Sequence, residues 1–225
     1  MKIAMLGGGM VGQTLAGKLL SNGHEVTIGI RSASAAELAK PRNYADTLTD
    51  WQARTGGRVA TFAEAAAAAD LVFNATSGLV SLAALAAAGA ENLAGKVLID
   101  VANPLDFSHG MPPFLPAALS ERTSLGEEIQ RAFPAALVVK AFNTVSAPVM
   151  VQPALVPGVE LLIAGNSAEA KARVAAFARD EFGWSGVVDL GDIAGARGTE
   201  HLMPLWLRLF LQGNSPLVAL KVIRG

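Results

Sequence analysis

One motif near the start of the chain restricts its fold more than any other feature, the run Gly7-Gly8-Gly9-Met10-Val11-Gly12. Its Gly-x-Gly-x-x-Gly spacing allows a sharp turn, a close approach of the backbone to a pyrophosphate and tight packing of a helix on a strand. The apolar run Lys2–Leu6 predicts a strand before it, and leucines at helical spacing predict a helix over 10–20 after it. A second strand predicted at Glu25–Ile30 completes a βαβ unit of about 30 residues. This context predicts a dinucleotide held by backbone N–H groups, the alternative being a turn that serves packing alone.

The end of the second predicted strand indicates which dinucleotide binds. Enzymes that use NAD place an acid near this point to bind the adenosine ribose, whereas an Arg there accommodates the 2′-phosphate of NADP. This chain reads Ile28-Gly29-Ile30-Arg31-Ser32, with no carboxylate at the strand end. Arg31 and Ser32 therefore predict NADP(H), the alternative being a solvated surface Arg.

Strands and helices alternate along the rest of the chain. Further strands are predicted at Arg58–Thr61, 71–75, 96–101 and 136–142. Helices between them are predicted to begin at Ser34, Thr61 and Ser124, each followed three residues later by Glu, which is the spacing of a capping box. This alternation predicts an α/β fold of the Rossmann class, a doubly wound parallel sheet that binds ligands at the carboxyl ends of its strands.

Two parts of unequal size are expected. Residues 1–150 are predicted to form an NADP-binding Rossmann domain, and residues 151–225 a small C-terminal α/β extension that completes the ring pocket. The extension is predicted to contain strands at 159–164 and 186–190, a helix at 167–182 and an apolar helix near 200–212. Because that last helix is apolar nearly all round, it is either plain core or, as we expect, the interface of a homodimer.

Polar residues follow three of the predicted strands on the expected ligand edge. Each group begins with an Asn, whose side chain can both donate to and accept from a nicotinamide carboxamide or a ribose, but which is also a common turn former. The predicted cofactor contacts at these exits are Asn74, Ala75, Thr76, Asn103, Pro104, Asn143 and Thr144.

Composition excludes several classes of partner. The chain has 18 Lys and Arg against 19 Asp and Glu, so it offers no basic face for nucleic acid or for a membrane surface. It has no Cys, which excludes disulfides, thiolate zinc sites and Cys nucleophiles. The uncharged stretch 71–90 is long enough to span a bilayer, but its polar interruptions favour a strand, a turn and a helix. We expect a cytoplasmic protein with a small-molecule redox partner.

Four segments together resemble the NADP-dependent reductases of the deazaflavin coenzyme F-420 and their bacterial relatives. They are the glycine motif, Ile28-Gly29-Ile30-Arg31-Ser32, Asp100-Val-Ala-Asn-Pro104 and Val139-Lys-Ala-Phe-Asn-Thr-Val145. The resemblance implies a Rossmann domain with a small C-terminal part, often a dimer, and hydride exchange between nicotinamide C4 and a stacked deazaflavin ring. It implies cofactor contacts at Gly9, Met10, Val11, Arg31, Ser32, Thr76, Asn103 and Asn143.

Two residues depart from the family members that act on the deazaflavin. Those members have a His where this chain has Asn143 and a Thr where it has Gly8. The Asn143 version is closer to the cytosolic reductase domain of eukaryotic membrane metalloreductases, which passes electrons to an ordinary flavin. The resemblance thus leaves coenzyme F-420 and a flavin as alternative second ligands.

No catalytic side chain and no metal site are predicted, because hydride transfer between stacked rings needs proximity and exclusion of water more than an acid or base. His24 precedes the second predicted strand, on the side away from the expected ligand edge, and is expected to be structural. His109 lies in a loop after a ligand-edge strand, where it approaches a substrate or is simply solvated, and its neighbours Met111, Phe114 and Leu115 can form an apolar wall for a flat ring.

The sequence therefore predicts an NADP(H)-dependent oxidoreductase with a deazaflavin or flavin-type acceptor. Three alternatives remain: an NADP(H)-binding sensor without turnover, a flavin or ferric reductase, and a reductase of imines or 2-hydroxyacids. Length argues against the last, since those enzymes append a large helical domain and only about 75 residues follow Met150 here.

Overall fold

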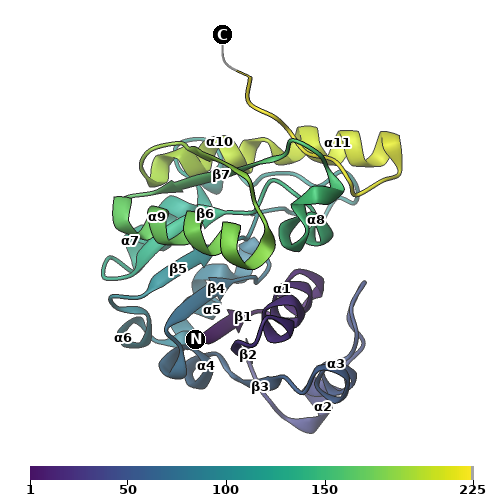
Figure 1. The fold of residues 1–225 in the computed structure, drawn as a ribbon, viewed down its shortest axis with the longest axis vertical. Coiled ribbons are helices and arrows are strands. Elements are labelled where there is room, and N and C mark those ends of the chain that lie inside the picture. Colours follow the sequence, from purple (N-terminus) through teal and green to yellow (C-terminus); the bar gives the residue numbers. More distant parts are fainter. Residues whose placement is uncertain (224–225) are drawn as a thin grey trace.

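One eight-stranded sheet forms the centre of the computed structural model, which describes residues 1–223 (Figure 1). The strands are β1 Lys2–Leu6, β2 Glu25–Ile30, β3 Arg58–Thr61, β4 Leu71–Asn74, β5 Val97–Asp100, β6 Leu137–Ala141, β7 Glu160–Gly165 and β8 Gly186–Asp189. Their order across the sheet is β3-β2-β1-β4-β5-β6-β7-β8. The first six strands are all parallel, so their carboxyl ends share one edge.

Helices cover both faces of this sheet (Figure 1). They are α1 Met10–Ser21, α2 Ala35–Leu38, α3 Leu48–Thr55, α4 Phe62–Ala68, α5 Ser81–Ala88, α6 Ala90–Leu93, α7 Leu125–Ala132, α8 Ala147–Val151, α9 Ala168–Phe177, α10 Ala196–His201 and α11 Met203–Gly213. The core on one face includes α1, α8 and α9, and the core on the other includes α4, α5 and α7. This arrangement confirms the predicted doubly wound Rossmann class.

The three predicted helix starts are all present. The Ser34 and Ser124 hydroxyls accept hydrogen bonds from the backbone N–H of the Glu three residues on, at 3.3 and 3.2 Å. At Thr61 both halves of the capping box form, because Glu64 also accepts from the Thr61 backbone N–H at 2.9 Å. Capping satisfies backbone N–H groups that the first turn of a helix leaves unpaired.

The structure contains a helix that the sequence pattern did not predict. Helix α3 buries only Leu48 and Trp51, both fully, so its apolar stripe is too short to stand out. The uncharged stretch 71–90 contains β4, a short 3-10 turn and α5, as predicted. Within residues 1–223, none of the helices has both the length and the apolar character needed to cross a membrane.

The C-terminal residues extend the same sheet. Strand β7 pairs with β6 in the antiparallel direction and β8 then runs parallel to β7. The helix predicted over 167–182 consists of α9 and a π-helical turn, Ala178–Phe182. The apolar helix predicted near 200–212 is divided into α10 and α11.

Helix α11 is buried on one side only. Met203, Trp206 and Leu207 are buried, whereas Leu205 and Leu209 are 50% and 40% exposed. The buried side forms a small core cluster, as one of the two interpretations predicts, whereas the other side meets solvent in the single chain. Figure 1 shows α10 and α11 together at the end of the molecule farthest from α2 and α3.

Candidate functional site

The glycine loop has the close approaches that its spacing predicts. Gly7 has φ of +117°, and a Cβ on it would lie 2.4 Å from the carbonyl oxygen of Ala75. A Cβ on Gly12 would lie 1.9 Å from the Gly7 oxygen, whereas one on Gly9 would meet nothing within 4 Å. Packing thus requires the first and third glycines, and the second leaves open space in front of the backbone.

Helix α1 begins directly after this open space. Gly9 is its N-cap, no side chain caps it, and its first turn, which contains Met10 and Val11, holds no acidic residue. The N–H groups of this turn and the positive end of the helix dipole are therefore available to an anion. This is the local chemistry that a pyrophosphate needs.

Gly8 is buried against α3. A Cβ on Gly8 would lie 3.0 Å from Cδ1 of Leu48, so Leu48 fills the space that a larger residue at position 8 would need. This contact gives a physical reason for Gly at position 8, and it depends on α3, the helix that the sequence pattern did not predict.

Arg31 and Ser32 leave β2 at the same edge and are exposed. Glu37 on α2 lies among three cationic side chains: Lys40 donates a hydrogen bond to its carboxylate, and Arg42 and Arg31 are close enough to act on its charge. These cations hold the pKa of Glu37 below its ordinary value. The sequence pattern had selected only Arg31, but the structure adds Lys40 and Arg42 to a positive region at the β2 exit.

A row of buried polar side chains crosses the carboxyl edge of the sheet. The strand register places Asn74 beside Asp100 and Asp100 beside Lys140. Asn74 Nδ2 donates to Asp100 Oδ1 at 2.8 Å, and Lys140 Nζ donates to Asp100 Oδ2 at 2.9 Å. All three side chains have 0% exposure. We name Asn74, Asp100 and Lys140 the polar row.

The first member of the polar row serves the fold. Asn74 Nδ2 also donates to Ser81, and Asn74 Oδ1 accepts from the hydroxyl and the backbone N–H of Thr76. These bonds use the full hydrogen-bonding capacity of the Asn74 amide. The predicted contact through Asn74 stays a prediction, but its side chain is placed to hold the loop.

Glu200 on α10 completes the row from the C-terminal part. Its Oε1 lies 2.9 Å from Lys140 Nζ, and its two oxygens accept from the backbone N–H groups of Leu125 and Gly126 at 2.9 and 3.1 Å. Burial disfavours the charged ammonium, but the carboxylates of Asp100 and Glu200 outweigh that effect, so the pKa of Lys140 lies above its ordinary value. The sequence signals for this cluster are a charged residue in each of two apolar strands, Asp100 in β5 and Lys140 in β6.

Two of the predicted asparagines bind each other. Asn103 Nδ2 donates to the Asn143 carbonyl at 2.7 Å, and Asn143 Nδ2 donates to Asn103 Oδ1 at 2.9 Å. We name them the Asn pair. Within the described residues, Asn143 Oδ1 is buried and accepts no hydrogen bond. A buried amide oxygen without a donor costs about 1 to 3 kcal/mol, so it marks a place where a ligand donor is expected.

The turn that aims Asn143 is strained. Phe142 has φ of +65°, a region that bulky residues rarely adopt. Its fully buried ring meets Phe182 and Trp184 edge to face, which fixes it against the C-terminal part. The residues that follow the two asparagines, Pro104 after Asn103 and Thr144 after Asn143, are also buried.

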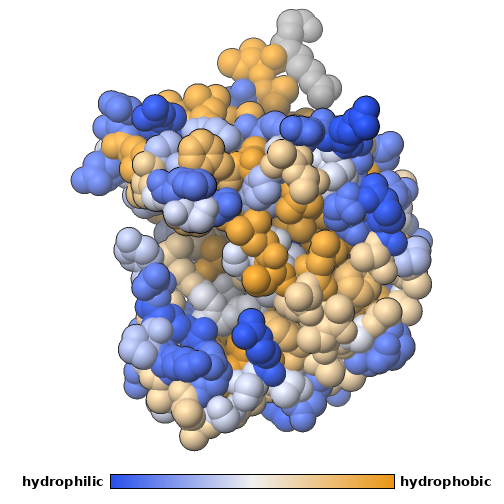
Figure 2. Space-filling model, turned by 180° about the vertical axis from the view of Figure 1, so that it is seen from behind, coloured by the Kyte–Doolittle hydropathy of each residue, from blue (hydrophilic) through white to orange (hydrophobic). Residues whose placement is uncertain are grey.

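Two of the three histidines, His24 and His109, lie at opposite edges of the sheet. His24 lies at the amino edge and contacts Glu181, which supports the predicted structural role. His109 packs edge to face on Phe114, with ring centroids 6.0 Å apart, in a loop where Met111 and Phe114 are more than half exposed. Figure 2 shows a recess on its left side, with apolar atoms inside it and hydrophilic atoms along much of its rim. This side corresponds to the right of Figure 1, where α11 and α8 lie above α3.

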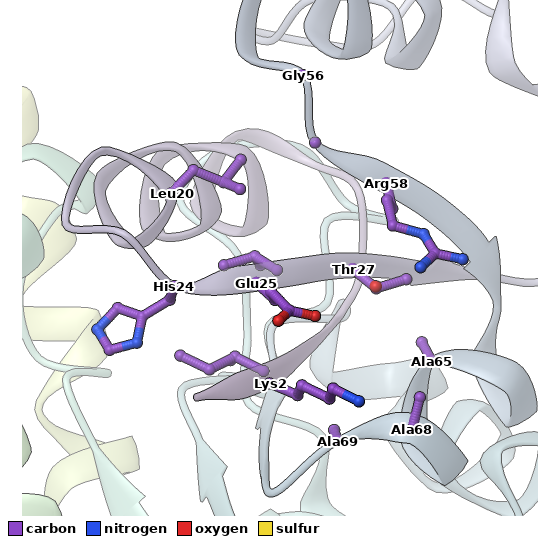
Figure 3. A pocket seen from close by; sticks show the side chains of 13 residues that line it. Lys2, Leu20, His24, Glu25, Thr27, Gly56, Arg58, Ala65, Ala68 and Ala69 are labelled. Atoms are coloured by element: carbon purple, nitrogen blue, oxygen red, sulfur yellow. The ribbon is translucent and has the colours of Figure 1, made fainter.

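A separate cavity of about 270 Å³ lies at the opposite, amino edge. Figure 3 shows Lys2, Glu25, Thr27 and Arg58 around it, with alanines of α4 along one wall. It contains none of the predicted site residues. The carboxyl edge, where those residues gather, is therefore the candidate site.

Comparisons with known proteins agree with this geometry. Residues 2–104 match the family described as coenzyme F-420-dependent NADP oxidoreductase. A solved protein of Arthrobacter sp. FB24, assigned provisionally as an F-420-dependent NADP-reductase, is 49% identical over the full length of both chains, with a TM-score of 0.93. The chain belongs to this family. It is therefore an NAD(P)-binding oxidoreductase with a Rossmann-like fold, which confirms the predicted resemblance and class of enzyme.

Two further similarities are more distant. The chain is 31% identical over 214 residues to the metalloreductase STEAP3 of Rattus norvegicus. The match covers 91% of this chain but only 38% of that relative, so the chain spans less than half of the relative's length. An imine reductase of Myxococcus stipitatus solved in complex with NADP+ has a TM-score of 0.63 at 17% identity over 95% of this chain and 63% of that one. This last likeness shows the fold alone.

The glycine geometry predicts that two matched substitutions affect different properties, one the stability of the fold and the other cofactor binding. Gly12→Ala should lower the free energy of unfolding by about 3 kcal/mol, because the new Cβ collides with the Gly7 carbonyl. Gly9→Ala should cost less than about 1 kcal/mol, but it should weaken NAD(P)(H) binding because its Cβ enters the open space. Urea unfolding and calorimetric titration measure the two effects. Equal stability of the two variants would contradict this assignment.

Proposed function

We propose that this chain binds NADP(H) along the carboxyl edge and exchanges hydride between nicotinamide C4 and a deazaflavin or flavin-type acceptor. The observation that carries the proposal is the buried, unpaired Oδ1 of Asn143 at the β6 exit. Asn143, after β6, and Arg31, after β2, lie far apart along the carboxyl edge of the sheet. Four strand spacings separate β2 from β6, or about 19 Å, a span that suits an extended dinucleotide.

The residues along this edge fit the parts of that molecule in order. Arg31 and Ser32 would hold the 2′-phosphate, and the N–H groups at Gly9 and Met10 the pyrophosphate. Asn143 Oδ1 would accept from the carboxamide N–H, with the Asn pair fixing its orientation. When bound, the nicotinamide supplies or accepts the hydride, so the chain itself needs to orient rings and exclude water.

Binding at Asn143 requires a local movement. Its Oδ1 is covered in the free chain, so the groups over it must move aside as the carboxamide enters. The bond formed there replaces an unsatisfied acceptor, which favours the bound arrangement. Residues 151–225 supply the aromatic side chains behind Phe142, and we propose that this part completes the pocket for the second ring.

The acceptor is tested by turnover. The purified protein is given NADPH with coenzyme F-420, FMN, FAD or riboflavin in parallel, and NADPH loss is followed by its absorbance. Oxidation with at least one ring acceptor is expected: F-420 alone would agree with the family description, and flavins alone would agree with the likeness to a metalloreductase. Absence of turnover with all four, together with tight NADPH binding, would contradict the proposal and favour a sensor.

Arg31 provides a test of cofactor choice. Arg31→Ala should weaken NADPH binding about tenfold to a hundredfold and leave NADH binding nearly unchanged, because a charge-assisted hydrogen bond to the 2′-phosphate contributes about 1.5 to 3 kcal/mol. Arg58→Ala is the matched control, since Arg58 is also exposed but begins β3 at the amino edge. Equal losses for both nucleotides in Arg31→Ala would refute the assignment.

We further propose a homodimer formed through the exposed apolar side of α11 and the 106–114 loop. Leu205, Leu209, Met111 and Phe114 are each at least 40% exposed, and Leu105, which precedes the loop, packs against the buried side of α11. Large exposed apolar side chains are typical of interfaces. Light scattering after size exclusion should give twice the chain mass, and Leu209→Glu should shift it to the monomer. A monomeric wild-type protein would contradict this proposal.

A further inference from the structure

Lys140, Asp100 and Glu200 form a cluster of buried charges that the proposed hydride exchange does not use. Lys140 and Asp100 are 0% exposed and Glu200 is 1% exposed. Lys140 Nζ donates to Asp100, to Glu200 and to the carbonyl oxygen of Ala102, so each of its three hydrogens has an acceptor. The cluster therefore fixes the ammonium in one position.

Stability alone is a poor explanation for such a cluster. Taking charges out of water costs several kcal/mol for each ion, and replacing a buried ion pair by apolar residues is often neutral or stabilising. An apolar residue is compatible with this level of the sheet, because Leu6 of β1 occupies it beside Asn74. What the cluster does provide is a defined position for the groups that it binds.

Those groups lead directly to the Asn pair. Asp100 Oδ1 accepts from the backbone N–H of Ala102 at 3.2 Å, while Lys140 donates to the Ala102 carbonyl, so both backbone polar groups of Ala102 are bound by the cluster. The next residue is Asn103, whose side chain exchanges two hydrogen bonds with Asn143. Asn143 itself follows Lys140 by three positions, across the strained turn at Phe142.

We propose that Lys140 is a positioning residue: by holding Asp100 and Ala102 it sets the orientation of Asn103 and Asn143 that receives the nicotinamide carboxamide. This inference rests on the proposed function, because it assigns the nicotinamide end of NADP(H) to the Asn pair. Arg31 and the glycine loop follow β2 and β1, whereas the three hydrogen bonds of Lys140 go to Asp100, Glu200 and Ala102, so the adenosine end should depend on Lys140 much less than the Asn pair does.

The test compares NADP+ with 2′,5′-ADP, which is only the adenosine half of the cofactor. Calorimetric titration of Lys140→Met should show NADP+ affinity reduced about tenfold, the loss of one well-formed hydrogen bond. Affinity for 2′,5′-ADP should stay within about twofold, because its contacts lie at the β2 exit. In turnover, KM for NADPH should rise and kcat should fall together.

Two further variants protect the test against misfolding. Asp100→Asn exchanges one oxygen for nitrogen and leaves one Lys and one carboxylate in the cluster, so it should fold even where Lys140→Met does not, and should show a smaller change of the same sign. Lys171→Met is the matched control: Lys171 is 8% exposed and donates to Asp189 and to the Gly191 carbonyl, away from the Asn pair. It should leave both affinities unchanged.

The selectivity between the two nucleotides decides the result. Equal losses for NADP+ and 2′,5′-ADP in Asp100→Asn, or no loss for either, would overturn the positioning role and leave a purely structural cluster. A wild-type protein that binds neither nucleotide would instead overturn the proposed function, and the inference with it.

Discussion

Parallel pairing of the first six strands is the constraint on which the rest of the structure depends. Each connection between parallel strands must cross the sheet as a helix or a long loop, so the turns that leave the strands all meet at one edge. This collects Gly7–Gly12, Arg31, the Asn74–Thr76 loop and the Asn pair from distant parts of the chain. Two close contacts then fix the loops against one another, because Gly7 lies against Ala75 and Gly78 against Asn103.

The polar row gives this edge its unusual interior. Asn74, Asp100 and Lys140 occupy neighbouring register positions where parallel strands are ordinarily apolar. Glu200 then connects the row to the N-terminus of α7 and brings the C-terminal part against the Rossmann sheet. The second half of the chain is therefore joined to the cofactor edge by buried charge as well as by the aromatic packing around Phe142.

Much of the fold followed from local patterns, and less of the site did. The glycine motif, the alternation of strands with helices and the three capping sequences act over a few residues, so they were readable. Helix α3 was missed because two apolar side chains make a weak stripe, and hydrophobic alternation carries no information on the antiparallel direction of β7. The partnership of Lys140 with Glu200 joins distant positions, which one sequence does not reveal.

A crystal structure with NADP+ bound tests the central claim most directly. The pyrophosphate should lie on the N–H groups at Gly9 and Met10, with the 2′-phosphate on Arg31. The carboxamide nitrogen should lie within hydrogen-bond distance of Asn143 Oδ1, which accepts no hydrogen bond from residues 1–223. Density for the nucleotide at the amino-edge cavity, or a nicotinamide turned away from the Asn pair, would contradict the claim.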